Sequence, residues 1–530
     1  MTLEEQAANL SQEEVVALLG IRQGFFDLQE KYLQQSKRFA ELEQQNDWFK
    51  RQLFGRKSER RIAIESHHQL SLGELVDVEE TPPPPTETIK GYQRRQRRKQ
   101  PLEGAVLEKG LRFDDSVPIE EVEIPNPALE GLDPSQYTIV SEKLTYRLAQ
   151  RPGSYVIVKY IRKVVKLKEA KKLVCASAPS SVLEKSYADV SLLAGFLIDK
   201  FRYHLPLYRQ HQRLAASGIQ VSRALLTNLV HRTVDLLEPI YYAMFSSILQ
   251  SHVITMDETP IKASRLNGKM KTGYFWPIYG DQDEIVFLFA PSRAGPVVRD
   301  TLESFEGILV SDGYKVYEKY AATIEEVTHA QCWAHTRRKF VDAKKVEPNL
   351  VATALDLIGT LYKYEADIRE QDLQGEEKQG YREKYSKPLI ETFFAWLNET
   401  FQKQTLLPTS PFTKAAHYAL DREKALQVFL KDPGVPIDTN HIERQIRPVA
   451  IGRKNWMFCW TEIGARYAGI ANSLIASCQL HQVDPYTYLV DVLQRIDRHP
   501  AMEVHRLTPR LWKKEFANDP LRSDIDPKKN

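Results

Sequence analysis

The chain has 530 residues, 42% of them hydrophobic, and a formal net charge of only +3, so it is long enough for three or four domains and is not basic overall. Any surface for nucleic acid must therefore come from local clusters of Lys and Arg. The four cysteines form no CxxC pair, the polar N-terminus lacks a signal-peptide pattern and no apolar run is long enough to span a bilayer, so we expect a cytoplasmic protein rather than a secreted or membrane protein.

The segment 1–61 is predicted to be helical and to dimerise as a coiled coil. Between Phe25 and Leu53, the side chains that would face a partner recur at alternating three- and four-residue steps. This period keeps one stripe along a supercoiled helix pair, and Asn46 at an a position would fix the register of a parallel dimer. The alternative is an amphipathic helix that packs on its own domain.

Residues 62–106 are expected to form a linker that carries a basic arm. Four consecutive prolines, Pro82–Pro85, cannot be helical and are typical of an extended linker. The basic residues between Lys90 and Lys99 would either bind DNA phosphates or form a solvated tail, and both interpretations stay open.

Two modules are expected before the central part of the chain. Residues 107–185 should form a small β module, because Ser154–Leu167 alternates apolar and polar residues and is rich in Val, Ile and Tyr. Residues 186–249 should form a helical, helix-turn-helix-like DNA-binding region, because Gly218 separates two helical patterns and Ser222 can cap the second. An ordinary helical hairpin explains this pattern equally well.

From residue 250 onward, the chain is expected to be mixed α/β and then helical. Short apolar runs predict strands at Val253–Met256, Thr272–Gly280, Glu284–Ala290, Gly307–Ser311 and Ala330–Trp333, with a helix at Pro296–Phe305. The pattern is continuously helical from about Val351 to Leu430, and another helix begins at Asn440. The segment 463–530 is expected to contain two helices, followed by a loosely held tail after His499.

Three acidic residues suit metal-dependent cleavage of a phosphodiester. Asp257 and Asp312 each follow a short hydrophobic strand, and Glu443 lies in the first turn of a helix, so all three can meet at one edge of a sheet. Two divalent cations about 4 Å apart can activate an attacking oxygen and stabilise a departing one. We therefore expect these residues to be the catalytic residues and the ligands of two Mg²⁺ ions, for which Mn²⁺ can substitute.

Each acid also has a purely structural interpretation. Asp257 would begin a turn before Pro260, and Asp312 with the following glycine is a common β-turn pair. Asn440 and Glu443 have the spacing of a capping box, in which Glu443 would only satisfy a helix-end amide. Taken singly, these interpretations are favoured, whereas the order of the three acids together favours the metal site.

Basic residues flank the acids and are expected to bind DNA, because cations hold phosphates and an aromatic ring can stack on an unpaired base. The expected DNA-binding residues are Arg337, Arg338, Lys339, Arg444, Arg447, Arg453, Lys454 and Trp456. For Trp456 the alternative is packing in the core. His329, Cys332 and His335 are spaced three residues apart, which offers a weaker zinc hypothesis because a fourth ligand is missing.

At these residues the chain resembles the insertion-sequence-66 family of DDE transposases. The most specific matches are CWAHTRRKFVDA at 332–343, DTNHIERQIRP at 438–448 and GRKNWMF at 452–458. The other matches are WFKRQLFGRKSE at 48–59, HLPLYRQ at 204–210, MDETP at 256–260, GYFWPIYGD at 273–281 and SDGYKVY at 311–317. They occur in the order typical of the family.

The resemblance implies an α/β catalytic core with a ribonuclease H-like mixed sheet. This core would comprise 250–345 and 431–462, split by an α-helical insertion at 346–430 and followed by C-terminal helices and a tail at 463–530. The resemblance also implies that the three acids are the DDE triad. It implies double-stranded DNA as the partner, at terminal inverted repeats and at a target, together with accessory proteins of the same element.

The chain departs from the family pattern in one region. The family usually carries two CxxC pairs ahead of the helix-turn-helix, whereas residues 121–180 contain only Cys175, so that zinc site cannot form here. Two rival functions stay open. One is a catalytically silent, transposase-derived DNA-binding protein, and the other is a structure-specific nuclease that hydrolyses DNA but never joins it.

Overall fold

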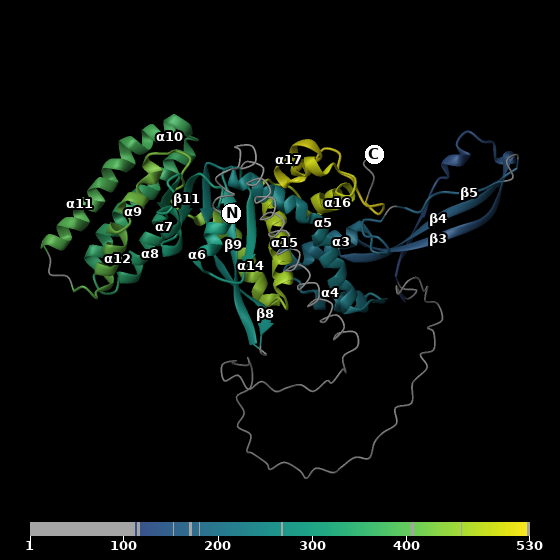
Figure 1. The fold of residues 1–530 in the computed structure, drawn as a ribbon, viewed down its shortest axis with the longest axis horizontal. Coiled ribbons are helices and arrows are strands. Elements are labelled where there is room, and N and C mark those ends of the chain that lie inside the picture. Colours follow the sequence, from purple (N-terminus) through teal and green to yellow (C-terminus); the bar gives the residue numbers. More distant parts are fainter. Residues whose placement is uncertain are drawn as a thin grey trace, which may run out of the picture. The chain divides into compact units, whose positions relative to one another are not determined.

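The computed structural model describes residues 112–113, 117–151, 153–168, 172–179, 181–266, 269–403, 407–456 and 458–526. The expected coiled coil at 25–53 and the basic arm at 90–99 lie outside these ranges. Figure 1 shows the described elements with the labels used below. No described helix combines the length and the apolar character needed to cross a bilayer.

A mixed sheet forms the centre of the described chain. Its strands are β7 (Val253–Met256), β8 (Thr259–Leu266), β9 (Lys269–Gly280), β10 (Ile285–Ala290), β11 (Gly307–Ser311) and β12 (Val327–Gln331). They follow the order β10-β9-β7-β11-β12, and β8 pairs with β9 outside this path. β11 runs parallel to both β7 and β12, whereas β9 runs antiparallel to both β7 and β10.

Short apolar runs predicted most of this sheet correctly. β7 and β11 have the predicted bounds, and β9 and β10 form the predicted hairpin. β12 begins and ends earlier than expected, because Trp333 is the first residue of helix α8 (Trp333–Ala343) and donates its N–H to the carbonyl of Ile437 at 2.9 Å. β8 was not predicted; it contains Pro260, which is unusual inside a sheet.

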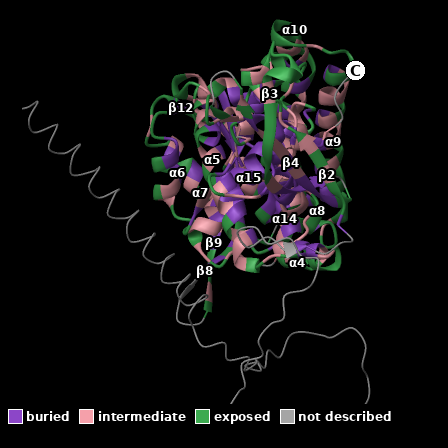
Figure 2. Ribbon diagram, turned by 90° about the vertical axis from the view of Figure 1, so that its right-hand side faces the viewer, coloured by how far each residue is buried: buried purple, intermediate pink, exposed green. Residues whose placement is uncertain are grey.

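The main hydrophobic core includes residues of the sheet and of two long helices, α5 (Arg223–Leu249) and α15 (Glu462–Leu480), and most of α15 is buried (Figure 2). At the edge strand β10, the hydroxyl of Ser473 accepts the N–H of Phe287 at 2.8 Å. The hydroxyl of Ser477 accepts the N–H of Ile285 at 3.1 Å. These side chains satisfy backbone donors that an edge strand would otherwise leave unpaired.

Gly469 allows α15 to approach β10 this closely. A Cβ at this position would lie 2.3 Å from the carbonyl oxygen of Phe287, a backbone atom that cannot rotate away. We expect Gly469→Ala to lower the free energy of unfolding by about 1–3 kcal/mol. This loss should appear as a lower melting temperature of the purified protein. The matched control is Gly359→Ala, where no atom lies within 4 Å of the new Cβ. Equal melting temperatures for Gly469→Ala and the wild type would contradict this account.

Further helices lie near the sheet. They are α6 (Gly295–Thr301), α7 (Lys315–Ala321) and α14 (Asn440–Trp456). The predicted helix at Pro296–Phe305 corresponds to α6, which ends four residues earlier than expected. The helix predicted to begin at Asn440 is confirmed as α14.

The stretch between α8 and α14 is helical, as predicted, and shares a second hydrophobic core with α8 and with residues of β7, β11 and β12. Its elements are α9 (Pro348–Glu370), α10 (Gly375–Tyr381), η4 (Arg382–Ser386), α11 (Lys387–Lys403), α12 (Pro411–Leu420), α13 (Glu423–Leu426) and η5 (Val428–Leu430). The buried Arg382 binds Glu365 through Nε at 2.7 Å and Nη2 at 2.9 Å. It also donates to the carbonyl of Phe429 at 2.8 Å, which ties three of these elements together.

A second sheet forms the predicted β module. Its elements are β2 (Ile119–Glu123), η1 (Pro127–Leu129), η2 (Pro134–Gln136), β3 (Tyr137–Arg151), β4 (Ser154–Leu167) and β5 (Leu173–Cys175). β4 has the predicted bounds, and it pairs with β3 along its whole length, from Tyr137 opposite Leu167 to Arg151 opposite Ser154. β2 and β5 both pair with β4.

The predicted helix-turn-helix pattern is present, but its second helix serves mainly as a core helix. The elements are β1 (Arg112–Phe113), α3 (Val190–Leu197), η3 (Ile198–Arg202), α4 (Leu207–Ala216) and β6 (Ile219–Gln220), followed by α5. Gly218 has a φ of +79°, and the Ser222 hydroxyl caps α5 by accepting the N–H of Leu225 at 3.2 Å. α5 then continues to Leu249, and its apolar face packs into the main core.

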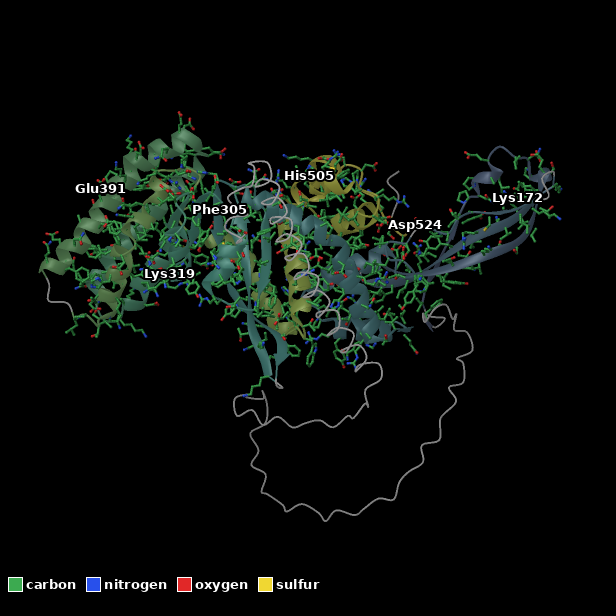
Figure 3. The ribbon with its side chains drawn as sticks, viewed as in Figure 1. Lys172, Phe305, Lys319, Glu391, His505 and Asp524 are labelled. Atoms are coloured by element: carbon green, nitrogen blue, oxygen red, sulfur yellow. The ribbon has the colours of Figure 1, made fainter. Side chains whose placement is uncertain are left out.

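The expectation of a loosely held tail after His499 is wrong. After α16 (Pro485–Arg495), the chain continues through η6 (Ala501–Leu507) and α17 (Pro509–Glu515). Trp512 is 2% exposed and donates to buried Asp491 at 2.6 Å. Tyr160 of the β module donates to Asp524 at 2.6 Å, so the tail residues labelled in Figure 3 belong to the packed structure. Because the tail is mostly polar, its sequence did not reveal the few contacts that hold it in place.

Candidate active site

Asp257 and Asp312 leave the sheet side by side. Their strands, β7 and β11, are parallel neighbours, with Thr255 opposite Val310. Asp257 is two residues after Thr255 and Asp312 is two residues after Val310, so both acids lie at the same edge of the sheet. Neighbouring strands of a sheet are about 4.8 Å apart. The apolar runs VITM and GILVS put both strands in the core and deliver the acids at their ends.

Glu443 reaches this edge from the first turn of α14. The start of α14 is held on β7 by His441, whose Nε2 lies 3.0 Å from the hydroxyl of Thr255. The Glu443 carboxylate faces His335 Nε2 of α8 at 3.8 Å. The capping-box interpretation is not supported, because the N–H of Asn440 donates to Asp438 Oδ1 at 3.0 Å instead.

The electrostatics of Asp257 connect the three acids. The pKa of Asp257 is raised from 3.8 to about 7, mainly by burial. The hydrogen bond from the Glu258 N–H lowers this pKa, whereas the negative charges of Glu258, Asp312 and Glu443 contribute to raising it. Like charges lie close together here, and Arg293 pairs with Glu258 but not with Asp257 or Asp312. A bound cation would remove this repulsion, so the arrangement favours positive charge at this edge of the sheet.

The donor chemistry of the three acids fits Mg²⁺, which takes hard oxygen ligands and retains several waters. Within the described residues, no three side chains of His, Cys, Asp or Glu form a ready-made metal cluster. Asp257, Asp312 and Glu443 therefore do not by themselves form a group that could hold a metal ion in the described structure. Water and substrate oxygens would have to complete the coordination of any ion held there.

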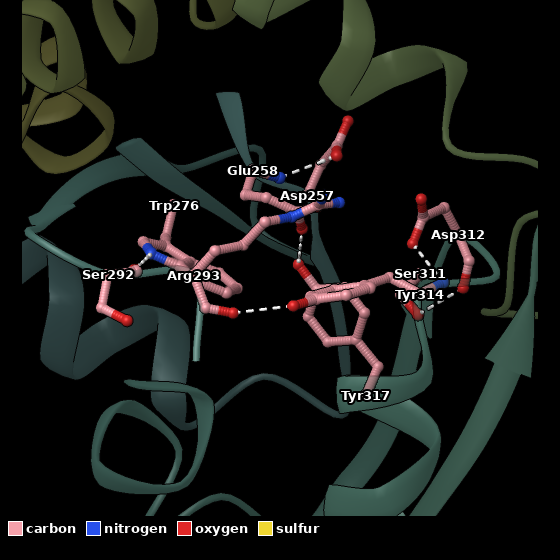
Figure 4. A network of polar contacts seen from close by, with 9 residues as sticks. All are labelled: Asp257, Glu258, Trp276, Ser292, Arg293, Ser311, Asp312, Tyr314 and Tyr317. Atoms are coloured by element: carbon pink, nitrogen blue, oxygen red, sulfur yellow. Dashed lines mark hydrogen bonds and ion pairs between the residues drawn. The ribbon is translucent and has the colours of Figure 1, made fainter. Parts of the chain in front are cut away.

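A network of polar contacts links the residues next to the two aspartates (Figure 4). The Glu258 side chain is only 3% exposed, pairs with Arg293 and accepts the hydroxyl of Tyr317 at 2.7 Å. Tyr314 donates its N–H to Asp312 Oδ1 at 2.8 Å and its hydroxyl to the carbonyl of Arg293 at 2.8 Å. We call Glu258, Arg293, Tyr314 and Tyr317 the clamp, because they connect the residue after Asp257 to the loop that carries Asp312.

Sequence reasoning missed the clamp. Its only local signal is the adjacent acidic pair in MDETP, in which Asp257 lies in the candidate site and Glu258 is buried. Burial raises the pKa of Glu258, whereas the Tyr317 hydroxyl and Arg293 lower it, so the carboxylate is held by specific partners.

The predicted DNA-binding residues divide into exposed and structural groups. The exposed side chains are Arg337, Arg338, Lys339, Arg444, Arg447 and Lys454. Arg453 is half-buried and donates to the Thr259 hydroxyl at 2.8 Å, which fixes α14 to β8. Trp456 is partly buried and packs against the main core, as its structural alternative expected. The exposed group is therefore better placed to meet DNA than Arg453 or Trp456.

The zinc hypothesis is not supported by these contacts. His329 Nε2 interacts with the hydroxyl at the end of β11 at 2.8 Å. The Cys332 thiol accepts the N–H of Thr439 at 3.3 Å, and His335 faces Glu443. The three side chains thus have three different partners, and no metal cluster forms among them in the described structure.

Comparison with protein families matches most of the chain. Residues 185–467, more than half of the chain, match the family described as "Transposase IS66 family". Residues 473–510 match the "IS66 C-terminal element", and residues 41–122 match "Transposase C of IS166 homeodomain". The last match lies largely outside the described residues, but indicates a DNA-binding-like region near the N-terminus.

Curated relatives occur in Sinorhizobium fredii. The "Uncharacterized protein y4hP" is 28% identical over 505 residues, which cover 90% of this chain and 89% of the relative. The "Uncharacterized protein y4jD" is 32% identical over 357 residues, which cover 64% of this chain and 69% of the relative. These names assign no activity. The extent of the family match nevertheless shows that the chain belongs to the IS66 family of transposases.

Proposed function

We propose that this chain binds the terminal inverted repeats of an insertion sequence and catalyses metal-dependent cleavage and strand transfer of DNA. The observation that carries this proposal is the placement of Asp257 and Asp312 after two adjacent parallel strands, with the first turn of α14, which carries Glu443, anchored on one of them. His441 holds the start of α14 on β7, and the negative charges of Asp312 and Glu443 both act to raise the pKa of Asp257. The family assignment supports transposase activity, and the triad supplies its chemistry.

In the proposed mechanism, Asp257, Asp312 and Glu443 would be the residues that hold the metal ions. When bound, two Mg²⁺ ions, for which Mn²⁺ can substitute, supply an activated oxygen nucleophile and stabilise the departing oxygen. The backbone N–H of Tyr314 orients the Asp312 carboxylate, and the N–H of Glu258 orients that of Asp257. Exposed Arg444, together with its neighbours on α14 and α8, would hold the phosphates.

We also propose that the central sheet is a ribonuclease H-like core. Its support is the strand order, in which an antiparallel hairpin precedes two parallel strands on the other side of β7. The helix pair α4 and α5 and the N-terminal region would recognise the ends of the element. The coiled coil would build a dimer or larger assembly, and accessory proteins of the element would join it.

The test uses labelled duplexes that carry the inverted repeats flanking the coding sequence. We expect nicking in Mg²⁺ or Mn²⁺ and joining of a pre-cleaved 3′-hydroxyl end to a target duplex. Binding without nicking would favour the silent DNA-binding protein. Nicking without joining would favour the nuclease, and absence of binding would contradict the whole proposal.

A further inference from the structure

A cavity of about 240 Å³ lies between η3, α14 and α15, outside the triad. Its walls include the apolar side chains of Phe201, Phe287 and Ile475, which are 4%, 1% and 5% exposed. Apolar walls that are buried in the fold yet open to a cavity are typical of ligand pockets. These apolar walls suit an uncharged group, and His204, Asn472 and Gln479 add polar atoms to the lining.

The rim of this cavity is cationic. Arg202, Arg444 and Arg447 line it, and none of the described residues that line it is acidic. In the part of the chain that the structure describes, Arg444 and Arg447 form no ion pair, and Arg202 lies 3.9 Å from Asp484. Guanidinium groups that are not already neutralised are suited to phosphate. The cavity thus combines an apolar interior with a phosphate-binding rim.

The cavity also lies on the flank of the helix that carries Glu443. Arg447 is one turn beyond Glu443 on the same face of α14, and Arg444 is rotated about 100° from Glu443 toward the cavity. A DNA strand that crosses α14 from the triad would therefore meet Arg444 and Arg447, which both line the cavity.

We propose that this cavity binds one unpaired deoxynucleotide of the element end, with its base between the apolar walls and its phosphate on the rim. This inference rests on the proposed function, because it assumes that a DNA end occupies the triad. A base paired within a duplex cannot enter a lateral cavity, so the nucleotide must leave the stack. Enzymes that hold an extruded base gain binding from contacts with its faces, which offsets the loss of stacking.

The test places 2-aminopurine, whose fluorescence rises when it leaves the stack, at one position at a time near the cleaved end. A second series carries it in the target duplex. We expect one position of the element end to brighten on binding to the wild type. Brightening in the target series instead would assign the cavity to target DNA and overturn the proposal.

Two variants report on the cavity itself. Ala476→Leu narrows it, because Ala476 lines it and is 7% exposed, and Arg202→Gln removes rim charge without adding volume. Both should suppress the brightening. In the wild type, an abasic residue at the bright position should weaken end binding about tenfold. In Ala476→Leu the same abasic residue should change nothing, because the cavity is already closed. The control is Arg498→Gln, an exposed charge after α16.

The outcomes separate this inference from the proposed function. Wild-type protein that binds and nicks the ends without brightening at any position overturns the inference alone. Equal brightening in the wild type, Ala476→Leu and Arg202→Gln does the same. Failure of the wild type to bind the ends overturns both. If Ala476→Leu melts far below the wild type, the comparison rests on Arg202→Gln.

Discussion

Asp257→Asn is expected to reduce metal-dependent cleavage of element ends by about a thousandfold or more while leaving end binding unchanged. The amide cannot provide the negative charge that a divalent cation requires, and loss of a few kcal/mol of transition-state stabilisation has this effect on rate. Single-turnover nicking of a labelled end duplex measures the rate, and a filter-binding or anisotropy assay measures binding. Nicking at the wild-type rate would remove Asp257 from the triad.

The same substitution should stabilise the protein when no metal is present. The folded-state pKa of Asp257 is raised to about 7, above its ordinary value of 3.8. The folded state therefore binds this proton more tightly than the unfolded state, and stability is lost as the pH rises from about 4 to about 7. Above this window the ionised carboxylate is fully destabilising, and an uncharged amide avoids the penalty.

In EDTA at pH 8, we expect Asp257→Asn to melt at a higher temperature than the wild type, with the difference shrinking toward pH 4. Asp497→Asn, an exposed substitution after α16, is the matched control and should show no such trend. Adding Mn²⁺ should raise the melting temperature of the wild type more than that of Asp257→Asn. A lower melting temperature for Asp257→Asn at pH 8 would mean that local contacts outweigh charge repulsion.

The candidate site could be predicted from the sequence because each of its three acids follows a local pattern. A strand end and a helix start are set by local patterns, so VITM before Asp257, GILVS before Asp312 and the helix signal before Glu443 could be recognised directly. Burial of an ionised carboxylate at such a position also lowers the stability of the fold, as the raised pKa of Asp257 shows. Conflicts between local sequence and stability are expected mainly at functional sites.

The parts that escaped prediction depend on contacts between distant residues. Glu258 meets Arg293 across 35 positions and Tyr317 across 59, and neither spacing has a local period. The packing of the C-terminal segment depends on single anchors, such as Trp512 on Asp491, inside a polar sequence. Likewise, periodicity identified the helix α5 but could not decide between a DNA-reading face and a core face.

The clamp predicts the second large effect. Glu258→Ala leaves the Arg293 guanidinium and the buried Tyr317 hydroxyl without their shared acceptor. The strand end that carries Asp257 then loses its connection to the loop that carries Asp312. Because residues behind metal ligands typically alter metal affinity or activity by roughly 10- to 100-fold, we expect a loss of this size in apparent Mg²⁺ affinity. The maximal rate at saturating Mg²⁺ should fall less.

A graded series separates positioning from simple loss of stability. Glu258→Gln keeps an acceptor for Tyr317 but loses the charge that pairs with Arg293, so it should lie between the wild type and Glu258→Ala. Tyr317→Phe removes one hydrogen bond and should have a smaller effect on metal affinity. Glu303→Gln, an exposed acid after α6, is the control.

The decisive readout is Mn²⁺ binding to the DNA-free protein by titration calorimetry, which does not require activity. If the clamp positions the aspartates, Mn²⁺ affinity should decrease in the order wild type, Glu258→Gln, Glu258→Ala, even at temperatures where all three remain folded. If melting temperature decreases in that order while Mn²⁺ affinity stays constant, the clamp only stabilises the fold. The buried carboxylate beside Asp257 would then contribute to packing, and the geometry of the two aspartates would be set by strands β7 and β11 alone.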